Sequence, residues 1–452
     1  MQHPARNKHT NGAQPLPVDK WVNEEEMRVS RHIFSDPQVY ELEVERIFNR
    51  CWLFLGHETE ISNPSDYVTR YMGDDQVIVI RGEDGIIRAF LNSCLHRGAQ
   101  VCRADGGNAR RFTCPYHAWT YDTEGKLITT SFDQYYDRKD FAKMGLTPVA
   151  QLDTYDGLIF ATWDPQAPPL HDYLGDMKWY LDLFFRRTPE GMTVLGPPQR
   201  WVVETNWKLP ALNFGTDTQH ALRVHYGPLA IGQSAGAPGV AEMMKIFGES
   251  PQVSFPQGHG LILIPNPPHF PDYFGFPSEL APLYQRTLNH EQLNFFKRMF
   301  TSVGTLFPYT SWIQPVLGVA AERPPVGFVS LRSWQPLGPQ KIELWSWYFA
   351  EKEASAAWKA ETLRAGIQTF AMSGTFEEDD AEVWASIVRA TKGSMARRQM
   401  MDFRAGVSLP PRKDFPGPGT AYSTLFSEPE QFNFLRRWKQ LIAQGENVYW
   451  VY

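Results

Sequence analysis

With 452 residues, the chain is long enough for two or more domains, each with its own hydrophobic core. A net charge of -6 at pH 7 supplies no basic field for a nucleic acid, and no apolar run approaches the roughly 20 residues of a membrane span. Residues 1–17 contain no apolar stretch that could direct secretion. We therefore expect a cytoplasmic protein in which residues 1–17 form a disordered lead-in.

The first predicted element is a helix that starts at Asp36 and Pro37, because aspartate caps a helix and proline fits its first turn. Apolar residues then repeat at helical spacing on one face: Tyr40, Val44, Ile47 and Cys51. We assign residues 1–49 to a tail and a lead-in helix that packs with the later of two domains.

From residue 66 the pattern changes to short apolar runs that are typical of β-strands. Strands are predicted at residues 67–73, 76–82, 86–92, 119–128 and 157–163. The residues Glu83 to Gly85 predict a hairpin turn between the second and third runs. We therefore expect a compact antiparallel domain over residues 50–165, followed by a linker at residues 165–170.

Two mixed pairs of metal ligands lie inside this domain. Cys94 and His96 form a Cys-x-His, and Cys114 and His117 form a Cys-x-x-His. Two thiolates and two imidazoles could hold a zinc ion or a [2Fe-2S] cluster, and the spacing alone does not choose. A structural zinc site usually pairs cysteine with cysteine and histidine with histidine, so mixed pairs favour the cluster.

The sequences CLHRG and CPYHAW resemble the Rieske signature C-x-H-R-G…C-x-x-H. The resemblance implies that Cys94 and Cys114 bind one iron of a [2Fe-2S] cluster and that His96 and His117 bind the other. Respiratory Rieske proteins carry two further cysteines that form a disulfide, and Ala99 and Tyr116 occupy those places here. A chain that only carries electrons is therefore not expected.

A second constellation follows at residues 204–227. Asp217 and His220 are three residues apart and would share a helix face, whereas His225 is about 140° further around a regular helix. We therefore predict a helix break at His225, with the helix ending at residues 226–228. A pair of histidines at this spacing is by itself weak evidence for a metal.

In this setting, residues 204–227 resemble the N-W-K…N-F-x-x-D-x-x-H-x(4)-H pattern of the large subunits of aromatic-ring-hydroxylating dioxygenases. The resemblance implies that His220 and His225 hold a mononuclear Fe(II) together with a distant carboxylate. GTFEEDDAEVW supplies Asp380 as that carboxylate, with Asp379 as the next candidate. Glu377 and Glu378 are explained by their place at a helix N-terminus.

The resemblance also assigns further residues. It places Asp217 between the mononuclear iron and the cluster of a neighbouring chain, and it implies a substrate pocket lined by Asn213, Phe214, Ala221, Phe370 and Phe376. Leu212 and Gln219 depart from the family pattern, which leaves the substrate open.

The rest of the chain predicts a second domain over residues 166–452. Strands are expected at 327–334 and 341–350, helices at 352–372 and 377–390, and loops over 227–276. The fold class is therefore α+β: an antiparallel β Rieske domain followed by a catalytic domain with an antiparallel sheet covered by helices.

The expected function is the catalytic α subunit of a dioxygenase that adds O2 to an aromatic ring, polycyclic or carboxylated, to give a cis-dihydrodiol. A Rieske monooxygenase or demethylase is the alternative. No G-x-G-x-x-G follows a strand, so electrons from NADH should arrive through a separate reductase and a ferredoxin. By resemblance the chain assembles as α3 or, with a small β subunit, as α3β3.

Overall fold

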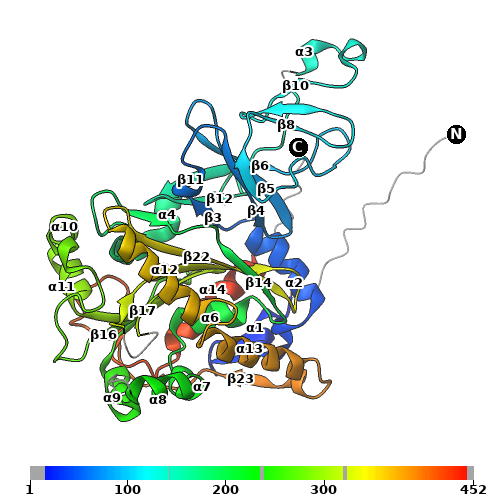
Figure 1. Cartoon of the computed structure of the whole chain (residues 1–452). Helices are drawn as coiled ribbons and strands as arrows, with labels where there is room; N and C mark the ends of the chain where they lie inside the picture. Colours follow the sequence, from blue (N-terminus) through cyan, green and yellow to red (C-terminus); the bar gives the residue numbers. More distant parts are fainter. Residues whose placement is uncertain (1–15, 142, 235–238, 319–322, 445–452) are drawn as a thin grey trace.

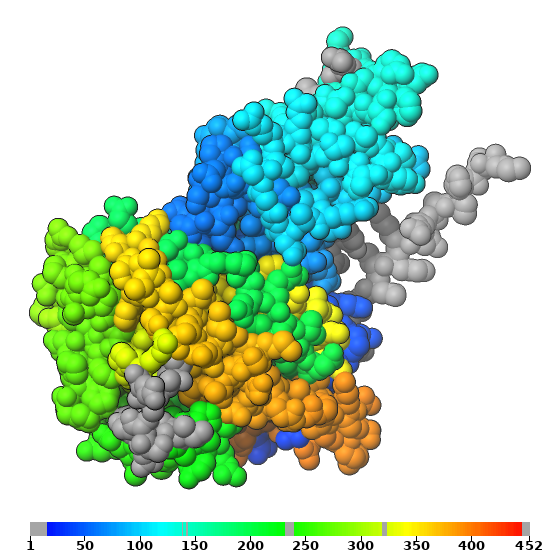
Figure 2. Space-filling model, viewed as in Figure 1, coloured from blue at the N-terminus to red at the C-terminus, as the bar shows by residue number. Residues whose placement is uncertain are grey.

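The computed structural model describes residues 16–141, 143–234, 239–318 and 323–444. We call residues 50–165 the cluster region and residues 166–444 the triad region (Figure 1). The cluster region projects from the larger triad region, as the space-filling view shows (Figure 2). Helices and antiparallel sheets occur together, which confirms the α+β class. Residues 1–15 of the expected lead-in lie outside the described residues.

The lead-in helix forms where the sequence predicts it. α2 (Pro37–Glu43) begins after Asp36, whose carboxylate accepts hydrogen bonds from the N–H groups of Gln38 and Val39 at 2.8 and 3.2 Å. The chain then continues into a π-helical turn, η2 (Val44–Phe48). Aspartate satisfies N–H groups that have no partner within the helix, and this fixes the starting point.

Glu43 attaches this helix to the triad region. Its carboxylate is fully buried and accepts hydrogen bonds from Lys208 Nζ at 2.5 Å and from the indole N–H groups of Trp207 and Trp438 at 2.8 and 2.7 Å. Because a buried charge without partners costs several kcal/mol, these contacts hold the lead-in helix against α6 (Lys208–Thr216).

The cluster region consists of three small antiparallel sheets with strand orders β6-β5-β4-β7, β10-β9-β8 and β11-β12-β3. Their strands are β3 (Leu53–His57), β4 (Asp66–Met72), β5 (Asp75–Arg81), β6 (Ile87–Leu91), β7 (Gly106–Asn108), β8 (Arg111–Thr113), β9 (Thr120–Asp122), β10 (Leu127–Thr129), β11 (Gln151–Tyr155) and β12 (Leu158–Thr162). The predicted hairpin between β5 and β6 and the predicted strands are confirmed, except that residues 119–128 form two paired strands, β9 and β10, with a turn between them. The two Cys/His loops follow β6 and β8.

The triad region is built on a nine-stranded sheet in the order β13-β22-β21-β18-β17-β16-β15-β24, with β14 also paired to β22. Its strands are β13 (Met192–Val194), β14 (Gln199–Val203), β15 (Gln252–Ser254), β16 (Gly260–Pro265), β17 (Met299–Leu306), β18 (Thr310–Gln314), β21 (Val329–Pro336), β22 (Ile342–Glu351) and β24 (Thr420–Tyr422). Every residue of β21 is buried, so both faces of the sheet are covered at its centre.

The main helices of this region are α6, α12 (Ala356–Phe370), α13 (Glu377–Thr391) and α14 (Pro429–Ala443). α6 contacts β16, β17 and β18, and α12 contacts β22. These helices and the strands β21 and β22 confirm the predicted helix-covered sheet.

The expectation of loops over residues 227–276 is wrong. The segment contains α8 (Tyr226–Ser234), α9 (Val240–Glu249) and the strands β15 and β16. β16 pairs with the neighbouring β15 on one side and with the distant β17 on the other, and β15 pairs with the distant β24. Residues 226–228 start a helix rather than end one, because proline is tolerated in a first turn.

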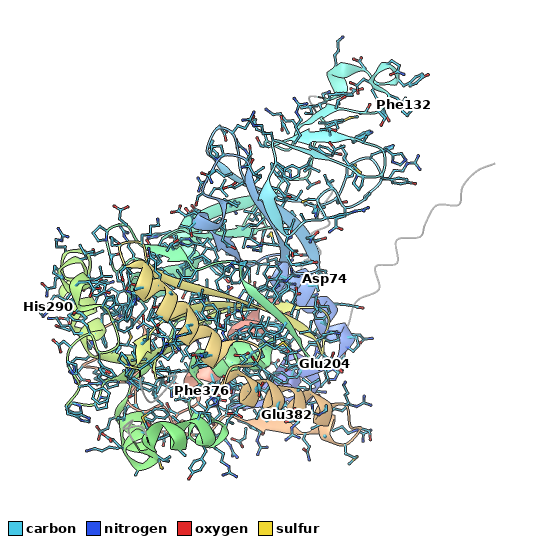
Figure 3. The ribbon with its side chains drawn as sticks, viewed as in Figure 1. Asp74, Phe132, Glu204, His290, Phe376 and Glu382 are labelled. Atoms are coloured by element: carbon cyan, nitrogen blue, oxygen red, sulfur yellow. The ribbon has the colours of Figure 1, made fainter. Side chains whose placement is uncertain are left out.

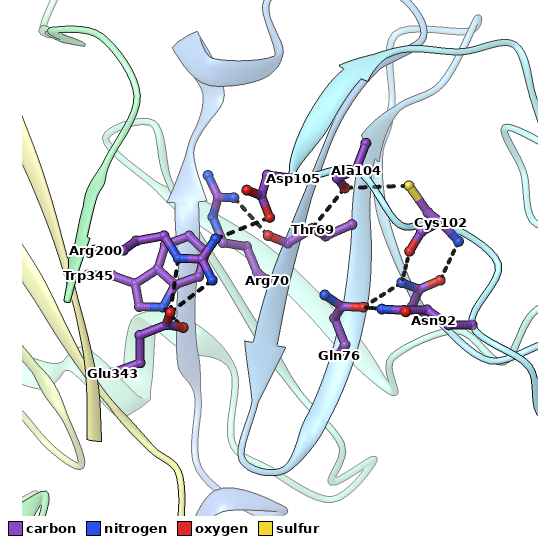
Figure 4. A network of polar contacts seen from close by, with 11 residues as sticks. Thr69, Arg70, Gln76, Asn92, Cys102, Ala104, Asp105, Arg200, Glu343 and Trp345 are labelled. Atoms are coloured by element: carbon purple, nitrogen blue, oxygen red, sulfur yellow. Dashed lines mark hydrogen bonds and ion pairs between the residues drawn. The ribbon is translucent and has the colours of Figure 1, made fainter. Parts of the chain in front are cut away.

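A set of charged and aromatic side chains joins the two regions (Figure 4). The guanidinium groups of Arg70 on β4 and Arg200 on β14 lie 5.1 and 4.0 Å from the ring centroid of Trp345 on β22. Arg200 also pairs with Glu343 at 2.9 Å and with Asp105 at 3.1 Å. Asp105 belongs to the loop between the two ligand pairs, so this loop contacts the sheet of the triad region directly.

Candidate metal centres

The Cys/His loops of the cluster region are two tight turns of similar construction. In the first, the N–H of Gly98 bonds the carbonyl of Cys94 at 2.8 Å, and Gly98 has a φ of 72°. In the second, the N–H of Ala118 bonds the carbonyl of Cys114 at 3.0 Å, and Ala118 has a φ of 53°. Each turn therefore presents one cysteine and one histidine at its tip.

These turns bury the thiols and leave the imidazoles closer to the surface. Cys94 and Cys114 are 3% and 2% exposed, and the half-buried rings of His96 and His117 have centroids 4.5 Å apart. Nδ1 of His96 is buried and has no hydrogen-bond partner among the described residues. Because buried polar atoms are nearly always paired, this nitrogen and the donor set fit a [2Fe-2S] cluster with cysteines inside and histidines outside.

Neighbouring groups prepare these donors for a metal. Burial, together with the nearby His117 and Arg97, lowers the pKa of His96, which favours the neutral ring that a metal requires. The Tyr121 hydroxyl lies 3.1 Å from Cys94 Sγ and accepts the N–H of Leu95 at 3.2 Å. Burial and the contact with Cys94 raise the pKa of Tyr121, so the hydroxyl keeps a proton that it can donate to the sulfur.

At the second site, side chains from two distant segments meet. Nε2 of His220 and Nε2 of His225 lie 3.4 and 3.5 Å from the same oxygen, Oδ1 of Asp380. One donor atom from each of the three residues lies within 4.8 Å of the others. This Oδ1 is buried without a hydrogen-bond partner in the described part of the chain. Two imidazoles and one carboxylate in this arrangement fit an iron(II) ion with open positions.

The remaining ring nitrogens face further polar groups. Nδ1 of His220 lies 3.3 Å from the Asn213 amide and 3.6 Å from Oδ1 of Asp217. Nδ1 of His225 lies 3.5 Å from Oδ2 of Asp379. Contacts of this kind set the orientation of a ligand ring, so Nε2 of each ring points toward Asp380. Asp379, considered as an alternative ligand, approaches the opposite side of His225 instead.

The carboxylates make the second site favourable for positive charge. Burial alone disfavours the charged form of His220, but Asp380 and Asp217 outweigh this effect and raise its pKa to about 9. A divalent cation between His220 and Asp380 would supply the positive charge in place of a proton. Metal binding must therefore displace a proton from His220.

The prediction that Asp217 and His220 lie on one helix is wrong. α6 ends at Thr216, Asp217 has non-helical angles (φ -86°, ψ 86°), and α7 (Ala221–Val224) begins after His220. The two side chains are close because the chain turns between two helices. The predicted break at His225 is confirmed, since α7 ends directly before it.

Aromatic rings stand beside the triad. The Phe376 ring lies 5.1 Å from the His225 ring and is stacked on Phe370 at 5.4 Å, with an angle of 13° between the ring planes. Phe214 is buried and contacts Trp334 at 4.9 Å. Ala221 packs against an apolar cluster that includes α9, so its place in a substrate pocket stays a prediction.

The sequence did not predict that Glu377 has a buried partner. Glu377 lies in the first turn of α13, as predicted from its place at a helix N-terminus. It is also only 1% exposed, and it pairs with the fully buried Arg332 of β21. The available clue was a single arginine inside the apolar run GFVSLRSW.

Comparison with known proteins now decides the family. A family model described as Rieske [2Fe-2S] domain matches residues 51–135. Over 448 residues the chain is 33% identical to the biphenyl dioxygenase subunit alpha of Metapseudomonas furukawaii, covering 95% of this chain and 94% of that protein. The chain belongs to the alpha subunits of Rieske aromatic-ring dioxygenases.

Two further similarities bear on this α subunit. The crystal structure of naphthalene 1,2-dioxygenase from Rhodococcus sp. bound to indole matches it with a TM-score of 0.89 at 39% identity, covering 94% of this chain and 97% of that one. The N,N-dimethyl phenylurea N-demethylase subunit alpha of Sphingobium sp. (strain YBL2) is 33% identical over 427 residues, which is 92% of each chain.

Membership confirms the predicted class and cofactors. The α subunit is an oxidoreductase of the aromatic-ring dioxygenase family, which uses a Rieske [2Fe-2S] cluster, mononuclear Fe(II), O2 and electrons from NAD(P)H delivered by partner proteins. Members typically also pair with a β subunit. The similarity extends through the triad region, which excludes a protein that only carries electrons. Among the described helices, none has the length and apolar character that crossing a membrane requires.

Proposed function

We propose that this α subunit adds both atoms of O2 to an aromatic ring and forms a cis-dihydrodiol. The observation that carries the proposal is that Oδ1 of Asp380, which has no hydrogen-bond partner among the described residues, lies between two imidazoles. One of them, His225, lies beside the Phe376 ring, which is stacked on Phe370. An apolar wall next to a metal site favours an apolar aromatic substrate over a charged metabolite.

In this proposal His220, His225 and Asp380 hold Fe(II). Three protein donors on one face leave positions for O2 and water, and the bound iron supplies the activation of O2. Phe370 and Phe376 orient the substrate ring and exclude water from it. Cys94, His96, Cys114 and His117 hold the cluster that stores each electron until it is needed.

The two proposed centres of one chain lie in different parts of the molecule. The loops after β6 and β8 belong to the projecting cluster region in the upper part of Figure 1, and Phe376, which contacts His225, is in the lower part of the triad region in Figure 3. We infer that electrons pass between chains arranged head to tail, as α3 or, with a β subunit, as α3β3. A ferredoxin and an NADH-dependent reductase supply the electrons, which places the reaction in the cytoplasm.

Asp217 is the residue proposed at the junction between chains. Its side chain is 35% exposed while Oδ1 lies 3.6 Å from His220 Nδ1, so it can contact this histidine and a cluster histidine of the neighbouring chain together. We expect Asp217→Asn to keep both metals and a reducible cluster but to lose electron transfer to Fe(II). Rapid-mixing single turnover measures this step. Reoxidation of the cluster at the wild-type rate with substrate and O2 would contradict the bridge.

The reaction is tested with ¹⁸O2 and a panel of polycyclic hydrocarbons, benzoates and phthalates, using the chain with a suitable ferredoxin and reductase. Dioxygenation predicts that both labelled atoms appear in one product. Incorporation of one atom for every substrate turned over would refute it.

A monooxygenase or demethylase remains the second candidate, because a demethylase subunit alpha is as similar to this chain as the biphenyl enzyme in percentage identity. It predicts one labelled oxygen per product, or release of formaldehyde from N-methyl substrates such as phenylureas. The same labelling experiment separates the two candidates.

A further inference from the structure

A single buried guanidinium contacts the ends of two helices beside the triad. Arg332 lies within β21 and is fully buried. Its Nη1 donates to Oε2 of Glu377 at 2.5 Å, and its Nη2 donates to the backbone carbonyl of Phe370 at 2.6 Å. Phe370 is the last residue of α12 and Glu377 is the first residue of α13.

The chemistry of helix ends explains why one arginine suits both contacts. The last carbonyls of a helix lack helical partners and carry partial negative charge, so a cation near Phe370 is favourable. Glu377 adds a carboxyl group at the start of the next helix, where it accepts the hydrogen bond from Arg332. Arg332 therefore holds the end of α12, the start of α13 and the connection 371–376 in one arrangement.

The segment held in this way carries both parts of the proposed active site. Phe370 and Phe376 bound the connection, and their rings are stacked beside His225. Asp380 lies three residues after Glu377, so both side chains project from the same face of α13. The Arg332 guanidinium also lies 5.1 and 5.2 Å from the ring centroids of Phe214 and Phe370.

We propose that Arg332 and Glu377 are positioning residues that set the place of the Asp380 carboxylate and of the Phe370–Phe376 wall together. The inference rests on the proposed roles of Asp380 and of the two rings. Stability alone does not require such a pair, because apolar residues of similar volume can replace a buried ion pair without loss of stability. The Arg332–Glu377 pair instead keeps the metal and the substrate ring in a constant position relative to each other. This relative position determines which ring carbons receive oxygen.

The same sheet offers a matched control. Arg187 and Glu351 form a second buried pair, 2% and 1% exposed, with an Nε to Oε1 distance of 2.7 Å. The Arg187 guanidinium lies 4.9 Å from both Phe276 and Phe296. This pair thus resembles Arg332–Glu377 in burial and aromatic packing, but it contacts none of the triad residues.

The test compares Glu377→Gln and Arg332→Lys with Glu351→Gln and Arg187→Lys in the complete, iron-loaded protein. Three properties are measured: mononuclear iron retained against a chelator, the EPR spectrum of the Fe(II) site with nitric oxide as a probe, and the ratio of regioisomers formed from a substrate that the wild type converts. We expect Glu377→Gln to lower iron affinity about tenfold, to alter the EPR spectrum and to change the product ratio. The cluster spectrum should not change.

The control variants should lower the unfolding temperature by a similar amount and leave all three properties as in the wild type. If Glu377→Gln retains wild-type iron affinity, EPR spectrum and product ratio, or if the controls change them equally, the positioning role is refuted. If Glu377→Gln does not fold, the double variant Arg332→Met/Glu377→Met replaces it, because apolar side chains can substitute for a buried ion pair. We expect this variant to show the same lower iron affinity, altered EPR spectrum and changed product ratio. The iron content of the wild type is measured before any variant is compared. A wild type that binds no mononuclear iron would overturn the proposed function rather than the positioning role.

Discussion

The two metal centres differ in how the chain assembles them. All four proposed cluster ligands lie between residues 94 and 117, on two turns that their own backbone hydrogen bonds close. The proposed iron ligands are His220 and His225, which flank α7, and Asp380 on α13, and they meet only because the fold brings these two distant segments together. A local motif is therefore enough to build the first centre, whereas the second depends on the whole triad region.

Their surroundings differ as well. Leu95 and Tyr116, which lie between the cluster ligands in sequence, are 51% and 63% exposed. Asp380 is 3% exposed, and its neighbour His225 lies beside the Phe376 ring. An exposed rim suits electron exchange with another protein, and an enclosed apolar site suits a reaction that must exclude water.

The largest expected effect tests whether the two centres are independent. Asp380→Ala should remove the mononuclear iron and abolish product formation, because two histidines seldom hold Fe(II) against water, while the cluster remains. Cys114→Ala should do the opposite and remove only the cluster. Iron analysis and EPR of the reduced protein measure both centres. Loss of both centres in either variant would show that they do not form independently.

A smaller effect is expected from the groups that orient the ligands. Asp379→Asn removes the charge that lies 3.5 Å from His225 Nδ1, and we expect iron affinity to fall by roughly 10–100-fold. Glu378→Gln is the control, since Glu378 is the exposed neighbour in the same helical turn. If Asp379→Asn removes the iron completely while Asp380→Ala retains it, the carboxylate ligand has been misassigned by one residue.

The smallest effect concerns the cluster alone. Tyr121→Phe removes the hydroxyl that lies 3.1 Å from Cys94 Sγ. Because hydrogen bonds to the ligand sulfurs stabilise the reduced cluster, its potential should fall, and a net contribution of about 1 kcal/mol corresponds to roughly 40 mV for one electron. Redox titration followed by EPR gives the shift. An unchanged potential would mean that the hydroxyl does not donate to the sulfur.

Prediction from the sequence succeeded where a structure depends on neighbours along the chain. The helix cap at Asp36, the hairpin at residues 83–85 and the break at His225 are set by a few adjacent residues, and the structure has all three. It failed over residues 227–276, where glycine and proline hide short elements that pairing with the distant strands β17 and β24 stabilises. It also placed Asp217 and His220 on one helix, although a turn separates them.

By itself the sequence determined the α+β class, the family and the residues that the two motifs contain, since motif residues are close neighbours along the chain and their spacing limits the chemistry they can perform. Only the tertiary structure decided that Asp380, not Asp379, faces both Nε2 atoms, because one helical position changes the direction of a side chain by about 100°. Only the tertiary structure could pair Arg332 with Glu377, since the two residues come from a strand and a helix whose approach is set by the packing of the whole region.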